Sequence, residues 1–343
     1  MKNNSAFRDL LVPVLAVCVF LPGMAGMWWR YYFEFSEPQP PSLSGTLQTG
    51  QVKVGGLERT FSVYVPPELT RNAPLLVALH GANSSGQKLR RFTGYEFESL
   101  ADRHGFVVVY PDSFAGSWND CRVASYNTAR RQGIDDVGFV KAVIANLQAR
   151  YGGQRPVYVL GYSTGGLMVY RLAVEAPETF TAAAAISANL PVDGNSDCAP
   201  ARTPVSIAIV NGTADQINPF DGGNPHSVWT MNLGAVQSAE QSARYFAALA
   251  GHANKPRVER LPDRSHHAST WAERSTWSCG KANIELLAIH GGGHTISQPF
   301  VRQPRILGPT STDIDAPAEV WRFFTQPAET VALAHTGREA GGR

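Results

Sequence analysis

A serine between glycines is the first feature of this sequence that points to chemistry. Residues 157–166 read "VYVLGYSTGG", which places Ser163 in a G-x-S-x-G pattern between an apolar run and a segment with helical spacing. In this pattern a sharp strand-to-helix turn projects the serine hydroxyl out of a sheet. Glycines are expected there because a Cβ would collide in so tight a turn. The pattern therefore predicts a nucleophile, and the alternative is a glycine-rich helix start with Ser163 as N-cap.

A serine nucleophile needs a base that takes its proton and an acid that orients the base. After this type of turn, the acid and then the histidine follow the serine along the chain. Asp215 comes soon after the apolar run at 204–210, as expected of an acid that leaves a sheet in a short turn. Asp221 lies farther out before two glycines, which is typical of a loop. We predict Asp215 as the acid.

The base is expected after the last apolar run, at 283–289. That run continues as "HGGGHTISQP", which offers His290 and His294. His290 belongs to the end of the predicted strand, whereas the three glycines before His294 allow the chain to fold back toward the serine. We predict His294 as the base, which completes a triad with Ser163 and Asp215.

Attack on a carbonyl also needs two donors for the oxyanion that forms. One is usually the backbone N–H that follows the nucleophile, and the other comes from a loop after an early strand. Thr164 supplies the first, and the amide of Ala82 in "ALHGANSSG" is the natural second donor. The alternative for this loop is an ordinary glycine turn.

The elements that must position these residues alternate along the chain. Two runs alternate polar and apolar residues, as half-buried antiparallel strands do, at 50–56 and 59–67. Further strands are predicted at 74–81, 105–112, 156–161, 181–188, 204–212 and 283–291, and helices at 88–105, 135–152, 165–177, 236–251 and 316–324. This order predicts an α/β fold with a mainly parallel sheet and helices on both faces.

The first thirty residues differ from the rest of the chain. Lys2 and Arg8 precede an apolar stretch from Leu10 to Pro22 and then small residues, which is typical of a secretory signal. Counted through to the tryptophans that follow, the stretch is also long enough for a retained membrane anchor. A third alternative is lipidation at Cys18. All three place the remaining chain outside the cytoplasm.

The chain divides by composition into four parts. We expect the export segment or anchor at 1–30, a proline-rich linker at 31–44, one catalytic domain at 45–326 and a flexible tail at 327–343.

Charge and cysteine content exclude some function classes. The 30 basic and 28 acidic residues give a net charge of +2, which argues against a nucleic-acid partner. No C-x-x-C or H-E-x-x-H motif occurs, and the adjacent His266 and His267 are read as loop residues, so no metal site is expected. In an oxidising compartment two of Cys121, Cys198 and Cys279 can form a disulfide, and the sequence leaves the pair open.

Six motifs in this order resemble one family. They are "LHGANSSG", "YPDSFAGSWNDC", "DDVGFVKAVI", "GYSTGG", "NGTADQINPFDGG" and "HGGGHT", and together they are similar to the esterase family of polyhydroxybutyrate depolymerases, which is related to feruloyl and acetylxylan esterases. The resemblance implies an α/β-hydrolase fold, export, and ester hydrolysis without a cofactor. It also implies that Ser163, Asp215 and His294 carry the reaction.

The resemblance suggests a substrate contact, and the sequence differs from the family pattern at one place. It suggests that Trp118 and Asn119 lie beside the acyl or alcohol site, and the alternative for Trp118 is a core aromatic. The family commonly has Thr-Trp-Pro after the catalytic histidine, whereas this chain has Thr295, Ile296 and Ser297. The loop shape around Trp118, Asn83 and Ile296 is expected to set substrate preference.

The expected function is a secreted or periplasmic serine esterase. Its substrate is a polyester oligomer or an ester of a plant polysaccharide, and a membrane is a partner only through a retained N-terminal anchor. The alternatives are a serine peptidase of the same fold and a surface protein that binds without catalysis.

Overall fold

The computed structural model describes Met24 and residues 26–35, 38–151, 155–225, 233–252, 254–264, 269–278 and 281–326. The predicted export signal falls almost wholly outside these ranges, as do Cys18, the pair His266 and His267, Cys279 and the predicted tail. Among the described residues, no helix combines the length and the apolar character needed to cross a bilayer.

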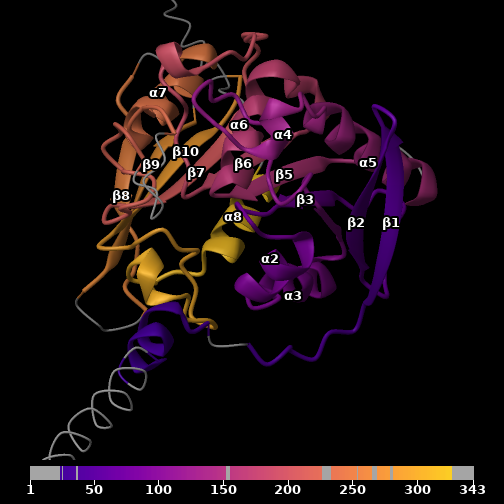
Figure 1. The fold of residues 1–343 in the computed structure, drawn as a ribbon, viewed down its shortest axis with the longest axis horizontal. Helices are drawn as coiled ribbons and strands as arrows, with labels where there is room; N and C mark the ends of the chain where they lie inside the picture. Colours follow the sequence, from indigo (N-terminus) through magenta and orange to yellow (C-terminus); the bar gives the residue numbers. More distant parts are fainter. Residues whose placement is uncertain are drawn as a thin grey trace, which may run out of the picture.

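A ten-stranded sheet runs through the described part of the chain, in the order β1-β2-β4-β3-β5-β6-β7-β10-β9-β8 (Figure 1). The six central strands are parallel to one another: β3 (Leu75–Leu79), β4 (Val107–Pro111), β5 (Val157–Tyr162), β6 (Ala182–Ile186), β7 (Ser206–Gly212) and β10 (Ile284–His290). Antiparallel strands extend both edges: β1 (Thr46–Val54) and β2 (Leu57–Val65) on one side, β9 (Trp271–Trp277) and β8 (Arg257–Arg260) on the other.

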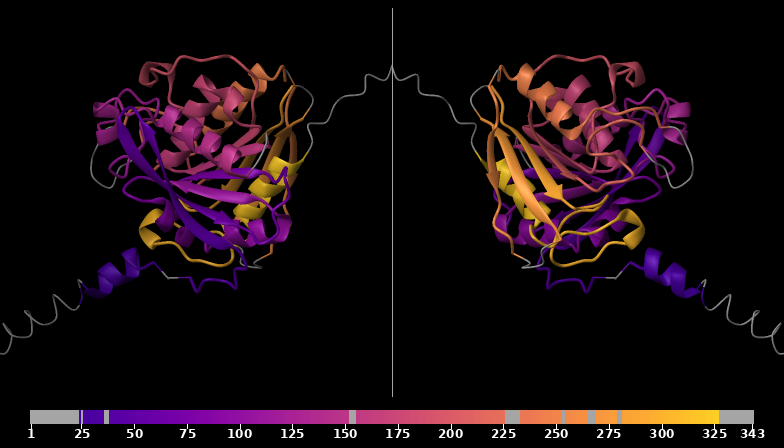
Figure 2. Two further views of the ribbon diagram at one scale, coloured as in Figure 1. Left: turned by 90° about the vertical axis from the view of Figure 1, so that its right-hand side faces the viewer. Right: turned by 90° about the vertical axis from the view of Figure 1, so that its left-hand side faces the viewer.

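Helices cover both faces of this sheet (Figures 1 and 2). One face carries α5 (Asp136–Tyr151), α6 (Thr164–Glu175) and α7 (Ala239–Leu249), and the other carries α2 (Gly86–Phe92), α3 (Glu96–His104) and α8 (Ala316–Thr325). A short helix, α4 (Thr128–Arg131), and 3₁₀ turns at Pro177–Thr179, Asp193–Asn195 and Arg305–Leu307 lie in connecting segments. The central strands are buried on both faces, which explains their nearly continuous apolar sequences. The predicted α/β fold is confirmed.

The predicted helix at 88–105 is two helices. The chain breaks between α2 and α3 because Gly94 and Tyr95 both have left-handed backbone angles, with φ of 63° and 60°. A Cβ on Gly94 would lie 2.9 Å from Cγ2 of Val301, so the bend also brings α2 close to the loop beyond His294.

The strands β8 and β9 were not predicted. The strand β8 has only four residues, three of them charged, and it occupies the sheet edge, where charge prevents pairing with other chains. Such a strand has the composition of a loop.

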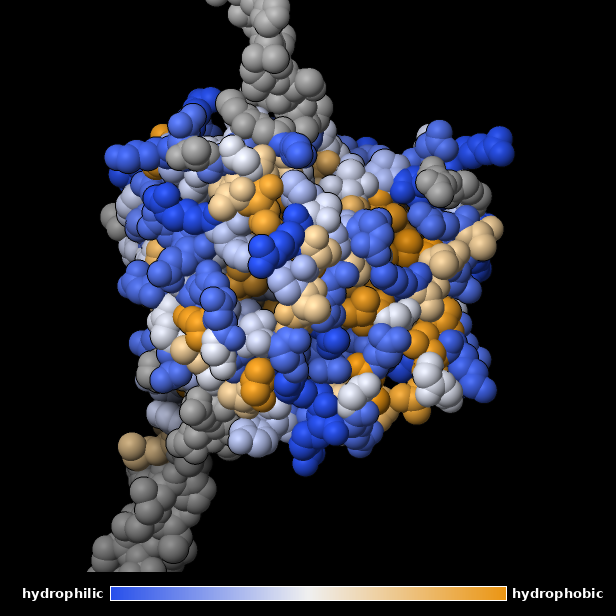
Figure 3. Space-filling model, turned by 90° about the horizontal axis from the view of Figure 1, so that it is seen from above, coloured by the Kyte–Doolittle hydropathy of each residue, from blue (hydrophilic) through white to orange (hydrophobic). Residues whose placement is uncertain are grey.

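The face over α5, α6 and α7 is mostly hydrophilic, with hydrophobic residues gathered in smaller patches (Figure 3).

Candidate active site

Ser163 stands on a strained turn between β5 and α6. Its φ of 54° and ψ of −120° lie outside the regions that non-glycine residues normally occupy. The flanking glycines are required by space: a Cβ on Gly161 would lie 2.1 Å from the carbonyl oxygen of Gly165, and one on Gly165 would lie 2.2 Å from that of Leu79. The collision predicted from the sequence is therefore confirmed, and Ser163 has no N-cap hydrogen bond.

Three strand ends bring Ser163, His294 and Asp215 into one hydrogen-bonded chain. The Nε2 atom of His294 lies 2.9 Å from Oγ of Ser163, and its Nδ1 atom lies 2.7 Å from Oδ2 of Asp215. With the proton on Nδ1, Nε2 is free to accept the serine proton. His294 and Asp215 are buried, whereas Ser163 is half-buried and reachable.

The position of Asp215 is fixed by the turn after β7. Its Oδ1 atom accepts hydrogen bonds of 2.8 Å from the backbone N–H groups of Ile217 and Asn218, which leaves Oδ2 for His294. The competing Asp221 lies on the exposed surface.

The glycines after β10 turn His294 back toward the serine, as the sequence predicts. Gly291 has a φ of 75°, and the His294 N–H donates to the carbonyl of Leu307 at 2.6 Å. On its other side, the Tyr162 hydroxyl donates to the His294 carbonyl at 2.7 Å. Burial and the nearby Asp215 charge hold the pKa of Tyr162 well above its usual value, so this hydroxyl keeps its proton. The competing His290 instead stacks on Trp271, with 3.6 Å between ring centroids.

The loop after β3 lies directly against the nucleophile. A Cβ on Gly81 would lie 3.3 Å from Cβ of Ser163. The neighbouring Ala82 is exposed, and its amide has no hydrogen-bond acceptor among the described residues. The amide of Thr164 opens α6 and has no acceptor within the helix. Both predicted oxyanion donors are thus free to bind a ligand oxygen.

His80 holds this loop from inside the fold. Its Nδ1–H donates to the Gly81 carbonyl at 2.7 Å, and the Ser113 N–H donates to its Nε2 at 3.0 Å. Burial lowers the pKa of His80, so the neutral ring that these two bonds require is favoured.

Known proteins resemble the chain in sequence and in fold. Residues 59–202 match the family model described as Esterase PHB depolymerase. NocK of Nocardia uniformis subsp. tsuyamanensis, which is named as an esterase, is 28% identical over 291 residues, covering 80% of this chain and 81% of NocK. Feruloyl esterase B of Thermothelomyces thermophilus is 35% identical over 128 residues, covering 36% of this chain and 42% of that enzyme.

A solved structure has the same fold. The acetyl xylan esterase from Aspergillus awamori superposes with a TM-score of 0.50 at 20% identity, covering 74% of this chain and 95% of that one. The chain belongs to the esterases of the α/β-hydrolase fold. The family named from the six sequence motifs is confirmed.

Trp118 lies behind the site of this esterase and not in it. The side chain is fully buried in the core, and its indole N–H donates to the His80 carbonyl at 2.8 Å. It therefore supports the loop that carries Ala82 and exposes no surface to the site. This corrects the suggested substrate contact, and the alternative of a core aromatic describes Trp118 better.

Asn119 is also held by the fold. Its backbone N–H donates to Asp136 at 2.7 Å, and its side-chain amide donates to the carbonyl of Ile134 at 2.9 Å. Asn119 lines a hollow of about 460 Å³ together with Tyr126 and Arg171. Ser163 does not line this hollow.

Ile296 replaces the tryptophan that is common in the family, but it is fully buried. Its backbone N–H donates to Oε1 of Gln303 at 2.9 Å, so it belongs to the packing of the histidine loop. Of the three residues expected to shape the substrate site, Asn83 alone is exposed, with a φ of 52° beside Ala82.

A disulfide joins Cys121 to Cys198 across 77 positions. It links the loop after β4 to the loop after β6, both of which leave the sheet at the edge that carries Ser163. Two of the three candidate cysteines thus pair, and Cys279 lies outside the described residues.

The sequence interpretation missed Tyr162 as a support of His294 and His80 as a support of the oxyanion loop. Both occur in the quoted motifs. The signal that marks both is a polar side chain at the end of an apolar strand, within two residues of a predicted site residue: Tyr162 precedes Ser163, and His80 lies two positions before Ala82.

Proposed function

We propose that this esterase is a serine hydrolase that works outside the cytoplasm and uses Ser163, His294 and Asp215 as its catalytic triad. The observation that carries the proposal is the hydrogen-bonded chain from the strained Ser163 through His294 to the buried Asp215. The polyhydroxybutyrate depolymerase type of esterase is the first candidate, and the feruloyl or acetylxylan type is the second.

In the first half-reaction, Oγ of Ser163 attacks the ester carbonyl carbon while Nε2 of His294 takes the hydroxyl proton. The carbonyl oxygen becomes an oxyanion that accepts hydrogen bonds from the amides of Ala82 and Thr164. The C–O bond to the alcohol then breaks, and the proton on Nε2 passes to the departing alkoxide. The products are a free alcohol and an acyl ester on Ser163.

In the second half-reaction, His294 takes a proton from water as the water oxygen attacks the acyl carbon. The same two amides hold the second oxyanion. The bond to Oγ breaks, His294 returns the proton to Ser163, and the carboxylic acid leaves. Asp215 keeps the proton on Nδ1 and stabilises the charged imidazolium in both halves.

The proposed compartment is extracellular or periplasmic. A disulfide between Cys121 and Cys198 suits an oxidising environment and is rare in the cytoplasm. The apolar run from Leu10 to Pro22 would direct export, either as a cleaved signal or as a retained anchor.

A fluorophosphonate label tests the triad. We expect the probe to modify the wild-type protein at Ser163 and to leave Ser163→Ala unlabelled. Equal labelling of the two proteins, or none of either, would contradict a serine hydrolase and favour a binding protein.

A substrate panel separates the two candidates. Turnover of hydroxybutyrate oligomers, methyl ferulate and acetylated xylan is compared with that of a p-nitrophenyl ester and a peptide amide. Faster turnover of hydroxybutyrate oligomers supports the first candidate, and faster turnover of methyl ferulate or acetylated xylan supports the second. Cleavage of the amide without any ester would indicate a peptidase.

A further inference from the structure

An aromatic helix precedes the catalytic fold and exposes its rings. Met24 and the helical segment 26–33 carry five of the eleven large hydrophobic side chains that are exposed in the described residues. These five are 55–68% exposed: Met24, Met27, Trp28, Trp29 and Tyr31. The rings pack along the helix itself, with centroids of Trp29 and Phe33 4.3 Å apart. An exposed apolar patch of this kind is typical of a binding surface.

The other side of this helix is attached to the fold (Figure 1). Arg305 donates a hydrogen bond of 3.4 Å to the Tyr31 carbonyl, and its guanidinium lies 4.2 Å from the Tyr31 ring centroid. Phe35 stacks on Phe92 of α2 at 5.8 Å. The aromatic helix therefore has a defined place beside loop 302–312, with its tryptophans facing outward.

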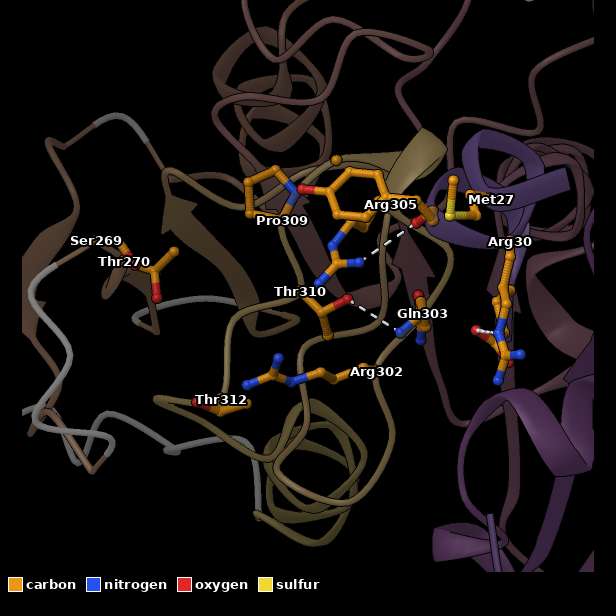
Figure 4. A pocket seen from close by; sticks show the side chains of 13 residues that line it. Met27, Arg30, Ser269, Thr270, Arg302, Gln303, Arg305, Pro309, Thr310 and Thr312 are labelled. Carbon is orange, nitrogen blue, oxygen red and sulfur yellow. Dashed lines mark hydrogen bonds and ion pairs between the residues drawn. The ribbon is translucent and has the colours of Figure 1, made fainter. Parts of the chain in front are cut away.

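A cavity of about 820 Å³ lies between the aromatic helix and loop 302–312 (Figure 4). Arg30, Arg302 and Arg305 all line it. Arg30 pairs with Glu34 at 3.0 Å, but neither Arg302 nor Arg305 has a carboxylate partner within the described part of the chain. The cavity thus has an excess positive charge directly beside exposed aromatic rings.

We propose that the aromatic helix and loop 302–312 form a docking surface for an anionic phospholipid bilayer. Tryptophan and tyrosine favour the interface between bilayer and water, and arginine favours anionic headgroups. The apolar run from Leu10 to Pro22 directly precedes this helix in the sequence, so the surface begins where the most lipophilic part of the chain ends. The His294 N–H donates to Leu307 within the loop, so docking holds the catalytic edge close to the bilayer.

Vesicle sedimentation tests the proposal with the full chain. Binding is measured on phosphatidylcholine vesicles with and without phosphatidylglycerol. The apolar N-terminal run should strengthen binding to both kinds of vesicle, whereas the arginines should strengthen binding only to the anionic vesicles that contain phosphatidylglycerol. The test variant is Arg302→Gln with Arg305→Gln. The control is Arg150→Gln with Arg244→Gln, which removes the same charge from α5 and α7 on the other face of the sheet. Turnover of a soluble p-nitrophenyl ester reports whether each variant is folded.

We expect the wild-type protein and the control to bind anionic vesicles more tightly than neutral ones. Each arginine near the surface contributes about fivefold, so the test variant should lose about 25-fold on anionic vesicles and little on neutral ones. Replacing Trp28 and Trp29 with alanine should weaken binding to both.

Equal losses in the control, or wild-type binding by the test variant, would overturn the proposal. A concentration-dependent dimer without vesicles, abolished by the tryptophan replacements, would assign the surface to a second copy of the chain.

Discussion

Replacing Asp215 with asparagine should disable the esterase by reversing the tautomer of His294. The backbone N–H groups of Ile217 and Asn218 both point at Oδ1, so the amide oxygen of an asparagine must take that place. Its NH₂ group then occupies the place of Oδ2, 2.7 Å from Nδ1 of His294. Two N–H donors cannot face each other, so the histidine proton moves to Nε2, where it faces Ser163 and prevents proton transfer.

The expected loss in kcat is about 10⁴-fold, the size found when a catalytic triad is forced into the wrong tautomer, or about 5.4 kcal/mol in the barrier. The fold should be little affected, because the asparagine oxygen still accepts both backbone hydrogen bonds. We expect a stability loss of about 1 kcal/mol from weaker hydrogen bonding.

The assay is steady-state hydrolysis of a p-nitrophenyl ester, with urea unfolding on the same samples. Asp221→Asn is the matched control, since this second acid of the loop is exposed and should keep wild-type kinetics. A kcat of Asp215→Asn within tenfold of wild type would refute the tautomer argument. An equal loss in Asp221→Asn would refute the assignment of the acid.

Three further predictions concern supports of the site and fold. Tyr162→Phe leaves the buried carbonyl of His294 unpaired and should cost about 1–3 kcal/mol in urea unfolding and lower kcat, with KM unchanged; wild-type kcat and stability would contradict it. Burial raises the pKa of Asp315 to about 6, so between about pH 4 and pH 6 this carboxyl holds a proton in the native state that it has lost in the unfolded state. The free energy of unfolding therefore falls as the pH rises through this range. Asp315→Asn keeps the cap of α8 and should be up to about 3 kcal/mol more stable at pH 7 but not at pH 4; destabilisation at pH 7 would contradict this sign. Replacing Cys121 and Cys198 with serine opens a link across 77 positions and should cost about 4 kcal/mol, and an unchanged unfolding midpoint under oxidising conditions would contradict it.

The fold was predictable because the amino-acid composition of the central strands reflects how deeply they are buried. Strands covered on both faces, such as β3 and β4, are continuous apolar runs, and they alternate with helices in an order that permits few topologies. The same order places residues after β5, β7 and β10 at one sheet edge. The proximity of Ser163, Asp215 and His294 could therefore be inferred before any distance was known.

Other features depend on contacts that the local sequence does not encode. The break between α2 and α3 places the left-handed Tyr95 after Gly94, and the neighbour of Gly94 is Val301, more than two hundred positions away. The pairing of Cys121 with Cys198 likewise depends on two loops that meet only in the folded sheet.

The supports of the site were harder to predict than the proposed catalytic residues for a chemical reason. A strained turn admits few residue types, so Ser163 and its glycines leave a recognisable pattern. The supports instead bond to the main chain: Tyr162 donates to the carbonyl of His294, and Trp118 to the carbonyl of His80. Every residue has a carbonyl, so no partner type in the sequence marks these bonds. The same reasoning applies to Trp118, which the family resemblance suggests as a substrate contact because it lies within one of the six motifs, whereas nothing in the sequence marks its bond to the carbonyl of His80.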